Sequence, residues 1–388
     1  MIVRTALGIG MAVCFGFFAS ARVRAAESLD VVIKIGVPEP LSGSLAAQGT
    51  DAVNGAKLAA LEINATGGVF GRKLEVLGID DACDAQQGVQ AMFKLIDQGS
   101  VAIVGGFCSG ATVPESDVAR RHGAIPFIAT ISSNPKFTEQ GYANVFRIAP
   151  RDDQAAVADA SYIREILKAK KVAILHDNTT YSKSAGGFAK RYFENNGIDV
   201  VYFDALTPAQ SDYSSVLTRI STYDPDVLYY SGYYPEFGAL VRQWAGLGLE
   251  FRLHGGGSTW DPVLLKTAGP ALGSPLVSIT TTPMGDFSPG AVKIADAYRR
   301  QFGTAPGTYA TWEYDGVLVL AAAIKLAGST DAQALNKALR QVDYQGLTGP
   351  IKFDAKGDRG DFPFIAINVQ QGNFTKTAHL AGNRWITD

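Results

Sequence analysis

Histidines and catalytic signatures are scarce in this chain of 388 residues. It contains only four histidines, and no two lie close enough in sequence to suggest a metal-binding pair. It has no Gly-x-Ser-x-Gly motif, and the glycine-rich run 105–110 lacks the lysine that a phosphate-binding loop requires. We therefore expect no metal, no cofactor, no catalytic residues and no enzymatic activity.

Long apolar runs are also missing, except at the N-terminus. The segment 1–26 carries Arg4, then an apolar run over 6–19, and then small residues. This order is typical of a secretory signal peptide, because about 14 apolar residues fall short of the roughly 20 that a membrane-spanning helix needs. We expect cleavage after Ala21, Ala25 or Ala26, and a mature protein in the periplasm.

Only three cysteines occur, and Cys14 lies in the predicted signal peptide. The remaining pair, Cys83 and Cys108, would then be in an oxidising compartment, where an even pair favours a disulfide over a reactive site. The closed loop of about 25 residues would stabilise the fold by roughly 3 kcal/mol in the chain-entropy model.

A strong net charge is absent. The formal net charge is −2, and the signal peptide removes three basic residues and no acidic ones, so the mature protein is mildly acidic. Such a composition gives no electrostatic basis for binding nucleic acid or anionic lipid. A mature chain of roughly 360 residues exceeds what one hydrophobic core usually supports, which predicts two domains.

From residue 31 onward, short β-branched runs alternate with longer amphipathic stretches. We expect strands over 31–37, 73–79, 101–104, 125–129, 171–175, 199–203, 227–230 and 251–254, and helices over 52–63, 85–96, 113–121, 152–169, 184–195, 213–221 and 236–247. This alternation predicts an α/β fold in which two doubly wound parallel sheets follow one another along the chain.

The last third of the chain is less regular. We expect a strand over 276–282, helices over 289–301, 311–327 and 332–341, and short strands over 351–353 and 364–369. These helices cannot form a third sheet, so we expect them to pack on the first two. A returning chain connects the lobes more than once, and such parallel connections permit a hinge that closes on a ligand.

Polar and aromatic side chains follow four of the expected strands, at the sheet edge where ligands bind. Phe107 and Ser109 follow the first, and Ser133 lies in the hydroxyl-rich run 130–135 after the second. A helix beginning near Ser109 would offer its free N–H groups and the hydroxyl to a carboxylate, although Ser109 could equally serve as a helix cap. Tyr181 and Tyr233 follow the other two strands. A single tyrosine is more often a packing residue, but the set of four strand ends favours a binding cleft.

At these residues the chain resembles the leucine/isoleucine/valine-binding proteins of ABC transporters, which are type I periplasmic binding proteins. The resemblance covers nearly the whole mature chain. The matching stretches are Asn-Ala-Thr-Gly-Gly at 64–68, Asp-Asp-Ala-Cys-Asp at 80–84, Cys108-Ser109, His176-Asp177 with Tyr181, the run 229–236, Gly349-Pro350 and the run 353–358.

The resemblance implies two lobes joined by a three-segment hinge, with a disulfide between Cys83 and Cys108. The predicted boundaries are signal peptide 1–26, lobe 1 over 27–150 plus 283–349, and lobe 2 over 151–282 plus 350–388. The resemblance also implies that Ser109 and Ser133, with backbone groups near Ile131, hold the ligand's α-carboxylate and amino group. Tyr181 and Tyr233 would close on it from the other lobe.

Two departures from the family pattern concern the ligand. Gly257 stands where branched-chain members have an acid that pairs with the ammonium, and Gln48 stands where an aromatic residue is usual. Losing a charge-assisted hydrogen bond would forfeit roughly 1.5–3 kcal/mol. Asp152 or Asp261 would supply the negative charge instead, or the ligand lacks an amino group.

We therefore expect a monomeric periplasmic receptor that binds a branched-chain or related amino acid and delivers it to a membrane permease. An alternative ligand is a non-amino carboxylate, such as an aromatic acid, or a short amide. Two other classes are a sensor that uses the same clamshell and a secreted hydrolase. The first lacks an output domain in this sequence, and the second lacks a nucleophile and base.

Overall fold

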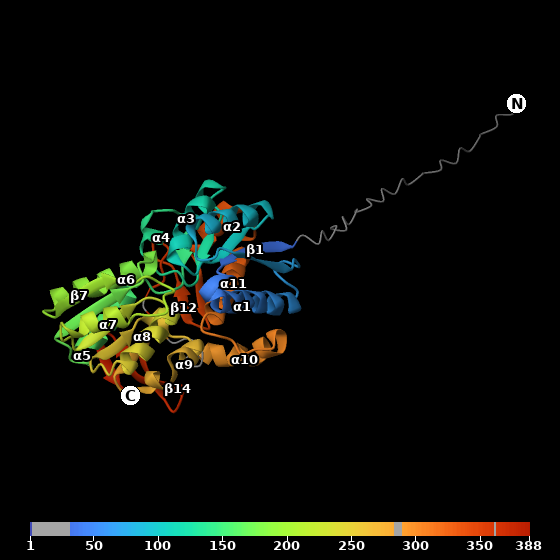
Figure 1. Ribbon diagram of the computed structural model, residues 1–388. Coiled ribbons are helices and arrows are strands. Elements are labelled where there is room, and N and C mark those ends of the chain that lie inside the picture. Colours follow the sequence, from blue (N-terminus) through green and yellow to red (C-terminus); the bar gives the residue numbers. More distant parts are fainter. Residues whose placement is uncertain (2–31, 283–288, 361) are drawn as a thin grey trace. The chain divides into compact units, whose positions relative to one another are not determined.

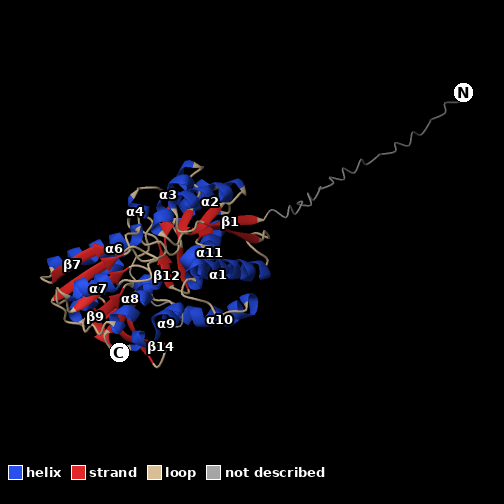
Figure 2. Ribbon diagram, viewed as in Figure 1, coloured by secondary structure: helices blue, strands red, loops and turns tan. Residues whose placement is uncertain are grey.

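The structure is a computed structural model that describes Met1 and residues 32–282, 289–360 and 362–388. Apart from Met1, the predicted signal peptide 1–26 and its candidate cleavage sites lie outside the described residues. Residues Val32–Asp388 form one compact unit. Two β-sheets with flanking helices can be followed within it (Figures 1 and 2).

The first sheet has five parallel strands in the order β2-β1-β3-β4-β5. Its strands are β1 (Ile33–Glu39), β2 (Leu74–Asp80), β3 (Ala102–Gly105), β4 (Phe127–Ala129) and β5 (Val145–Arg147). Every residue of β3 and β4 is buried, as expected for strands covered by helices on both faces. The sequence pattern predicted the first four strands and missed β5.

Helices α1 (Ala46–Ala65), α2 (Ala85–Asp97), α3 (Ser109–Arg121) and α4 (Lys136–Glu139) belong to this part of the chain, as does the short 3-10 helix η1 (Gly43–Leu45). The Asp84 carboxylate starts α2 by accepting hydrogen bonds from two backbone N–H groups of its first turn. Helix α3 begins four residues earlier than predicted. Cys108 is its N-cap, so Ser109 is the first helical residue and does not cap the helix.

The second sheet has eight strands in the order β15-β14-β13-β10-β9-β8-β6-β7. Five of them are parallel: β6 (Lys171–His176), β7 (Asp199–Ala205), β8 (Val227–Ser231), β9 (Arg252–Gly255) and β10 (Val277–Thr281). The associated helices are α5 (Asp152–Glu165), α6 (Thr180–Asn195), α7 (Ser214–Ser221), α8 (Tyr234–Gly246) and α9 (Pro262–Ala268), with the 3-10 helices η2 (Gly257–Thr259) and η3 (Gly269–Gly273).

The three C-terminal strands extend the second sheet in antiparallel fashion, whereas the sequence pattern predicted parallel sheets. They are β13 (Ile365–Gln370), β14 (Asn373–Ala381) and β15 (Arg384–Thr387). Only Gln371 and Gly372, both with positive φ, connect β13 to β14. A two-residue turn of this kind joins antiparallel strands, because a parallel pair needs a long crossover connection.

The helices between β10 and β13 return to the first sheet, as predicted. They are α10 (Pro289–Phe302), α11 (Ala310–Ala327) and α12 (Ala332–Leu339), followed by the hairpin of β11 (Asp343–Gly346) and β12 (Gly349–Lys352). Helix α11 packs against α1 and β3. Gly55 of α1 permits this approach, because a Cβ there would lie 2.0 Å from the Ala310 carbonyl oxygen.

The chain passes between the two sheets in three segments, which follow β5, β10 and β12. The exact lobe boundaries stay a prediction. In the described part of the chain, no single helix has the length and apolarity to cross a membrane, and the pair α11 and α12, bent by 110°, meets those criteria by length and composition.

A buried ion-pair network ties the first of these segments to the third. Arg147 is fully buried, and its Nε donates to the Asp358 carboxylate at 2.9 Å. Arg151 donates to the other oxygen of the same carboxylate at 2.8 Å. Burial alone would raise the pKa of Asp358, but the two guanidinium groups outweigh it and lower that pKa. The network therefore fixes two crossing segments relative to each other.

Candidate functional site

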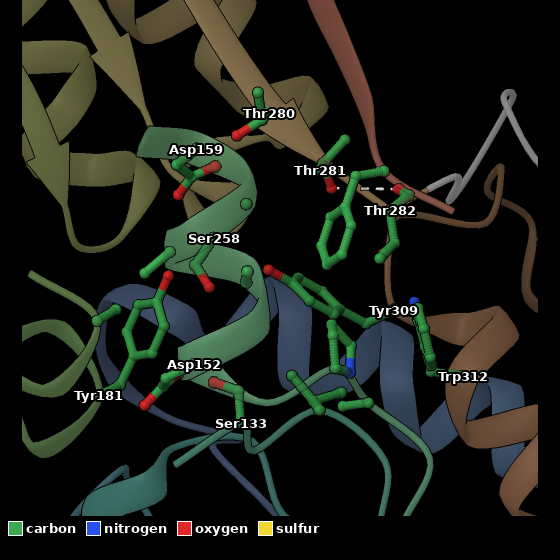
Figure 3. A pocket seen from close by; sticks show the side chains of 18 of the residues that line it. Ser133, Asp152, Asp159, Tyr181, Ser258, Thr280, Thr281, Thr282, Tyr309 and Trp312 are labelled. Carbon is green, nitrogen blue, oxygen red and sulfur yellow. Dashed lines mark hydrogen bonds between the residues drawn. The ribbon is translucent and has the colours of Figure 1, made fainter. Parts of the chain in front are cut away.

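A cavity lies where loops of the first sheet meet helix α5 and the second sheet (Figure 3). The volume open to the centre of a water molecule is about 70 Å³, and one buried water needs only roughly 10–15 Å³. The cavity therefore has room for a small organic solute. Its lining residues are Thr130, Ile131, Ser133, Ala149, Pro150, Asp152, Ala155, Ala156, Asp159, Tyr181, Ala185, Tyr229, Gly257, Ser258, Thr280, Thr281, Thr282, Tyr309, Trp312 and Phe364.

Elements attached to both sheets build the wall. Thr130, Ile131 and Ser133 follow the end of β4 in the first sheet, and Tyr309 immediately precedes α11. Tyr229 lies in β8 and Thr280 in β10, both strands of the second sheet. The cavity thus lies at the carboxyl ends of parallel strands, where open α/β sheets bind ligands.

Asp152 is the first residue of α5 and is fully buried. Neither of its carboxylate oxygens has a hydrogen-bond partner in the part of the chain that the structure describes. Burial raises the pKa of Asp152 to about 7, and the nearby hydroxyls of Ser133 and Ser184 and the charge of Arg147 offset only part of this effect. A buried, unpartnered carboxyl of this kind is poised to pair with a positively charged group that enters the cavity.

A second acid, Asp159, lies two helical turns farther along α5 and is 3% exposed. The Tyr229 hydroxyl donates to its carboxylate at 2.6 Å. Burial raises the pKa of Asp159 well above its usual range, and the hydrogen bond from Tyr229 reverses only part of that rise. Figure 3 shows Asp152 and Asp159 on the same helix, with one turn of the helix between them.

Hydroxyl and aromatic groups complete the wall. Tyr181 and Ser258 lie between the two acids in Figure 3, and the hydroxyl of Tyr309 points into the cavity from the opposite side. Burial raises the pKa of Tyr181, and its interaction with the Ser258 hydroxyl reverses part of that rise, so the phenol stays neutral. Trp312 and Phe364 add apolar surface.

Basic side chains are missing from the described residues that line the cavity. The wall holds two carboxyls and several hydroxyls, but no lysine, arginine or histidine. A carboxylate without an ammonium would therefore meet acidic groups and find no buried cation to pair with. The wall suits a guest that carries its own positive charge, with hydroxyls available for any carboxylate on the same molecule.

Five of the predicted ligand-binding residues line this cavity: Ile131, Ser133, Asp152, Tyr181 and Gly257. A Cβ at Gly257 would meet no atom closer than 3.6 Å, so the glycine leaves space at the position where the resembling family has an acid. Asp152 is on the cavity wall instead. The ligand-binding roles of all five residues stay predictions.

The other four predicted residues do not line the cavity. Phe107 and Tyr233 pack with Tyr309 in one apolar cluster, with a ring-centroid distance of 4.6 Å between Phe107 and Tyr309. The Ser109 hydroxyl lies 3.0 Å from the Ser132 hydroxyl and accepts a hydrogen bond from a backbone N–H. Of the apolar cluster, Tyr309 lines the cavity, whereas Phe107 and Tyr233 do not.

The sequence predicts ligand contacts for Gln48 and offers Asp261 as a source of negative charge, but the two side chains bind each other. The Gln48 amide donates to the Asp261 carboxylate at 2.9 Å, and both side chains are buried. The Tyr234 hydroxyl, which belongs to α8, donates to the Ser44 carbonyl oxygen at 3.1 Å. These bonds join α1 to the N-cap residue of α9 and join η1 to the first residue of α8.

Sequence reasoning missed Asp159, Ser258, Tyr309 and Trp312. A signal for Asp159 was present, since it follows Asp152 by seven residues and so lies on the same face of a predicted helix. No comparable signal marked the other three, because their place in the wall depends on how the returning helix α11 and the turn η2 pack. The predicted disulfide between Cys83 and Cys108 is confirmed, with its Cα atoms 5.2 Å apart.

Comparison with known proteins identifies the class. The family model of the periplasmic binding proteins matches residues 32–373, and the chain belongs to this family. An amino acid binding protein of Pseudomonas aeruginosa is 35% identical over 330 residues, which cover 85% of this chain and 87% of that protein. A leucine-specific-binding protein of Salmonella typhimurium is 32% identical over 86% of this chain and 89% of its own.

A solved structure gives the same answer for the fold. The branched-chain amino acid transporter substrate-binding protein of Streptococcus pneumoniae, determined in complex with isoleucine, superimposes with a TM-score of 0.79 at 28% identity. The match covers 89% of this chain and 99% of that one. The predicted resemblance and the predicted type I periplasmic binding protein fold are therefore confirmed.

Proposed function

We propose that this protein is a periplasmic receptor of an ABC importer, which binds an amino acid in the cavity and delivers it to a membrane permease. The protein holds its guest without transforming it and acts as a monomer. The amino-acid-binding relatives support this reading. The observation that carries it is the fully buried, unpartnered carboxyl of Asp152 on the wall of a solute-sized cavity.

The electrostatics of the wall favour a zwitterion over the alternative ligands. Asp152 would pair with the ammonium of the guest, and such a charge-assisted hydrogen bond contributes roughly 1.5–3 kcal/mol. The hydroxyls of Ser133, Tyr181 and Ser258 would donate to its carboxylate. A benzoate-like acid would offer no ammonium to Asp152, and a neutral amide would replace an ion pair by a weaker hydrogen bond.

Hinge closure is the proposed mechanism. The cavity wall combines residues attached to the two sheets, so a guest completes its contacts only when the two lobes meet. Binding then shifts the population toward the closed form, because the ligand makes more contacts there than in the open form. The lobes would correspond to 27–150 plus 283–349 and 151–282 plus 350–388, joined by the three crossing segments.

Contacts outside the cavity support closure. The Gln48–Asp261 and Tyr234–Ser44 hydrogen bonds each connect a residue assigned to lobe 1 with one assigned to lobe 2. The Phe107, Tyr233 and Tyr309 cluster does the same with apolar surface. In the proposed closed form, these groups cover the guest from one side and help the lobes stay together. The permease would recognise this closed form.

The test is calorimetric titration with leucine, acetamide and benzoate. Leucine should bind, and the other two should bind at least tenfold more weakly or not at all. Asp152→Asn should reduce leucine affinity at least tenfold, because the isosteric amide cannot form the ion pair. Ser109→Ala, which alters a buried hydroxyl outside the cavity wall, is the matched control and should change affinity less than threefold. Preferential binding of benzoate, or leucine binding that is indifferent to Asp152→Asn, would refute the proposal.

A further inference from the structure

Two buried acids on one face of α5 give the cavity two chemically similar ends. Asp152 and Asp159 are separated by seven residues, which corresponds to a rise of about 10.5 Å along the helix axis. Both line the same cavity. The proposed amino acid contact uses only Asp152, so the carboxyl of Asp159 has no role in that contact.

On helix α5 itself, the cavity-lining side chains between the two acids are small and apolar. Ala155 and Ala156 are the cavity-lining residues of α5 between Asp152 and Asp159. Each of them projects only a methyl group, so α5 presents apolar surface to the cavity between the two acids. Contact with a methylene chain of a ligand would bury this surface, and such burial contributes about 0.8 kcal/mol for each CH₂ group.

In the absence of a ligand, burial of the Asp159 carboxyl lowers the free energy of unfolding. Removing a carboxyl from water carries a penalty unless hydrogen bonds or an opposite charge compensate it. Among the described residues the Tyr229 hydroxyl is its only hydrogen-bond partner, and that bond engages one of the two oxygens. Replacing both Asp159 and Tyr229 by apolar residues of similar shape would change the stability of the folded protein little. The acid is therefore better explained by something that enters the cavity.

We propose that Asp159 is the binding site for a second cationic group of the guest, and that the cavity selects an amino acid whose side chain ends in an ammonium group at about the length of lysine. This inference deepens the amino acid binding proposed above and rests on it. The α-ammonium pairs with Asp152, the methylene chain passes Ala155 and Ala156, and the terminal ammonium pairs with Asp159. Each ammonium would lie about 2.8 Å from a carboxylate oxygen.

Charge balance supports this assignment. Since no basic side chain lines the described part of the cavity, its two carboxyls lack positive partners within the wall. A guest with two ammonium groups and one carboxylate supplies both partners and leaves the carboxylate for the hydroxyls of Ser133, Tyr181 and Ser258. Arg147, the basic residue that influences Asp152, is already engaged by Asp358.

Norleucine and lysine give a matched pair of ligands, because they share one carbon chain and differ only in the terminal ammonium. Titration calorimetry of the wild-type protein at pH 7.5 should give at least tenfold tighter binding of lysine than of norleucine. Asp159→Asn should weaken lysine binding at least tenfold and leave norleucine binding within threefold. Asp97→Asn, which removes an exposed acid far along the chain on α2, controls for net charge and should change neither affinity.

A second measurement needs no variant and so does not depend on how well Asp159→Asn folds. Calorimetry of the wild-type protein at pH 6, in two buffers of different ionisation enthalpy, counts the protons released on binding. Lysine should release more protons than norleucine, because burial raises the pKa of Asp159 and a cation paired with its carboxylate lowers that pKa.

The possible outcomes separate this inference from the proposed function. If norleucine binds and lysine does not, or if both release equal numbers of protons, Asp159 is not a cation site, whereas amino acid binding stands. If Asp159→Asn weakens both ligands equally, the acid has a structural role and the inference fails. If neither amino acid binds, the proposed function itself is wrong.

Discussion

The buried carboxyl of Asp152 makes the affinity for amino acids depend on pH in a specific way. In the free protein its pKa is raised to about 7, chiefly by burial, with Asp153 adding to the rise and Ser133, Ser184 and Arg147 opposing it. Tyr181 also lies close to it, but the phenol stays neutral below pH 8 because its own pKa is raised. An ammonium guest requires the ionised form of Asp152, so binding must remove the proton.

The size of the effect follows from the distance between pH and pKa. At pH 8 most of free Asp152 is already ionised, whereas at pH 5 only about one molecule in a hundred is. Each pH unit below the pKa costs 1.36 kcal/mol, so leucine affinity should fall about a hundredfold, or about 2.7 kcal/mol, between pH 8 and pH 5. The slope should approach one decade per pH unit below pH 6.

Calorimetric titration with leucine at half-unit intervals from pH 5 to pH 8 measures this profile. Proton release, determined in two buffers at each pH, should approach one proton at pH 5 and vanish near pH 8. Asp152→Asn should give a weak, nearly flat profile over the same range. A wild-type affinity that is constant from pH 5 to pH 8, or that increases toward low pH, would refute the pairing of Asp152 with an ammonium.

Four further predictions concern stability and closure. Folding raises the pKa of Asp152 from an unfolded value near 3.8, so the neutral carboxyl costs the folded protein nothing below pH 4, and the protein loses stability as pH rises through 7. Asp152→Asn should therefore stabilise the ligand-free protein at pH 8. In urea denaturation, this gain should be on the order of 4 kcal/mol larger at pH 8 than at pH 4. Asp358→Ala leaves a buried guanidinium unpaired and should cost about 3–5 kcal/mol in the same assay, and an unchanged midpoint would contradict the ion-pair network. Replacing Cys83 and Cys108 by serine should cost roughly 3 kcal/mol, and addition of a reductant should then have no further effect on the variant's melting temperature. Gln48→Ala should weaken leucine binding by about two- to tenfold, since one hydrogen bond of the closed form contributes about 0.5–1.5 kcal/mol; equal affinities for variant and wild type would show that this bond does not assist closure.

The central parts of both sheets could be predicted because their strands are buried on both faces. Runs such as 101–104 and 227–230 are short, apolar and separated by helices with clear periodicity, so their pattern leaves little ambiguity. Strand β5 (Val145–Arg147) was missed because it has only three residues and ends in a buried arginine. From sequence alone, an arginine is expected at the surface. The antiparallel end of the second sheet depends on the turn at Gln371 and Gly372, which the strand pattern does not reveal.

The candidate site could be predicted only where it follows strand ends. Ser133 and Tyr181 line the cavity because the loop after β4 and the first turn of α6 follow parallel strands at their carboxyl ends. Ser109 and Tyr233 also follow strands, but their side chains face Ser132 and the Phe107 cluster. Strand order places a residue near the edge, whereas the packing of neighbouring side chains decides which way it faces. Tyr309 and Trp312 enter through the returning helix α11, which no local pattern connects to the cavity.

A crystal structure of the protein with bound leucine tests the central claim most directly. The predicted result is leucine enclosed in the cavity between the two sheets, with its ammonium within hydrogen-bonding distance of the Asp152 carboxylate and its carboxylate surrounded by the hydroxyls of Ser133, Tyr181 and Ser258. Leucine bound instead beside Ser109 and Tyr233, with Asp152 left unpaired, would contradict the account.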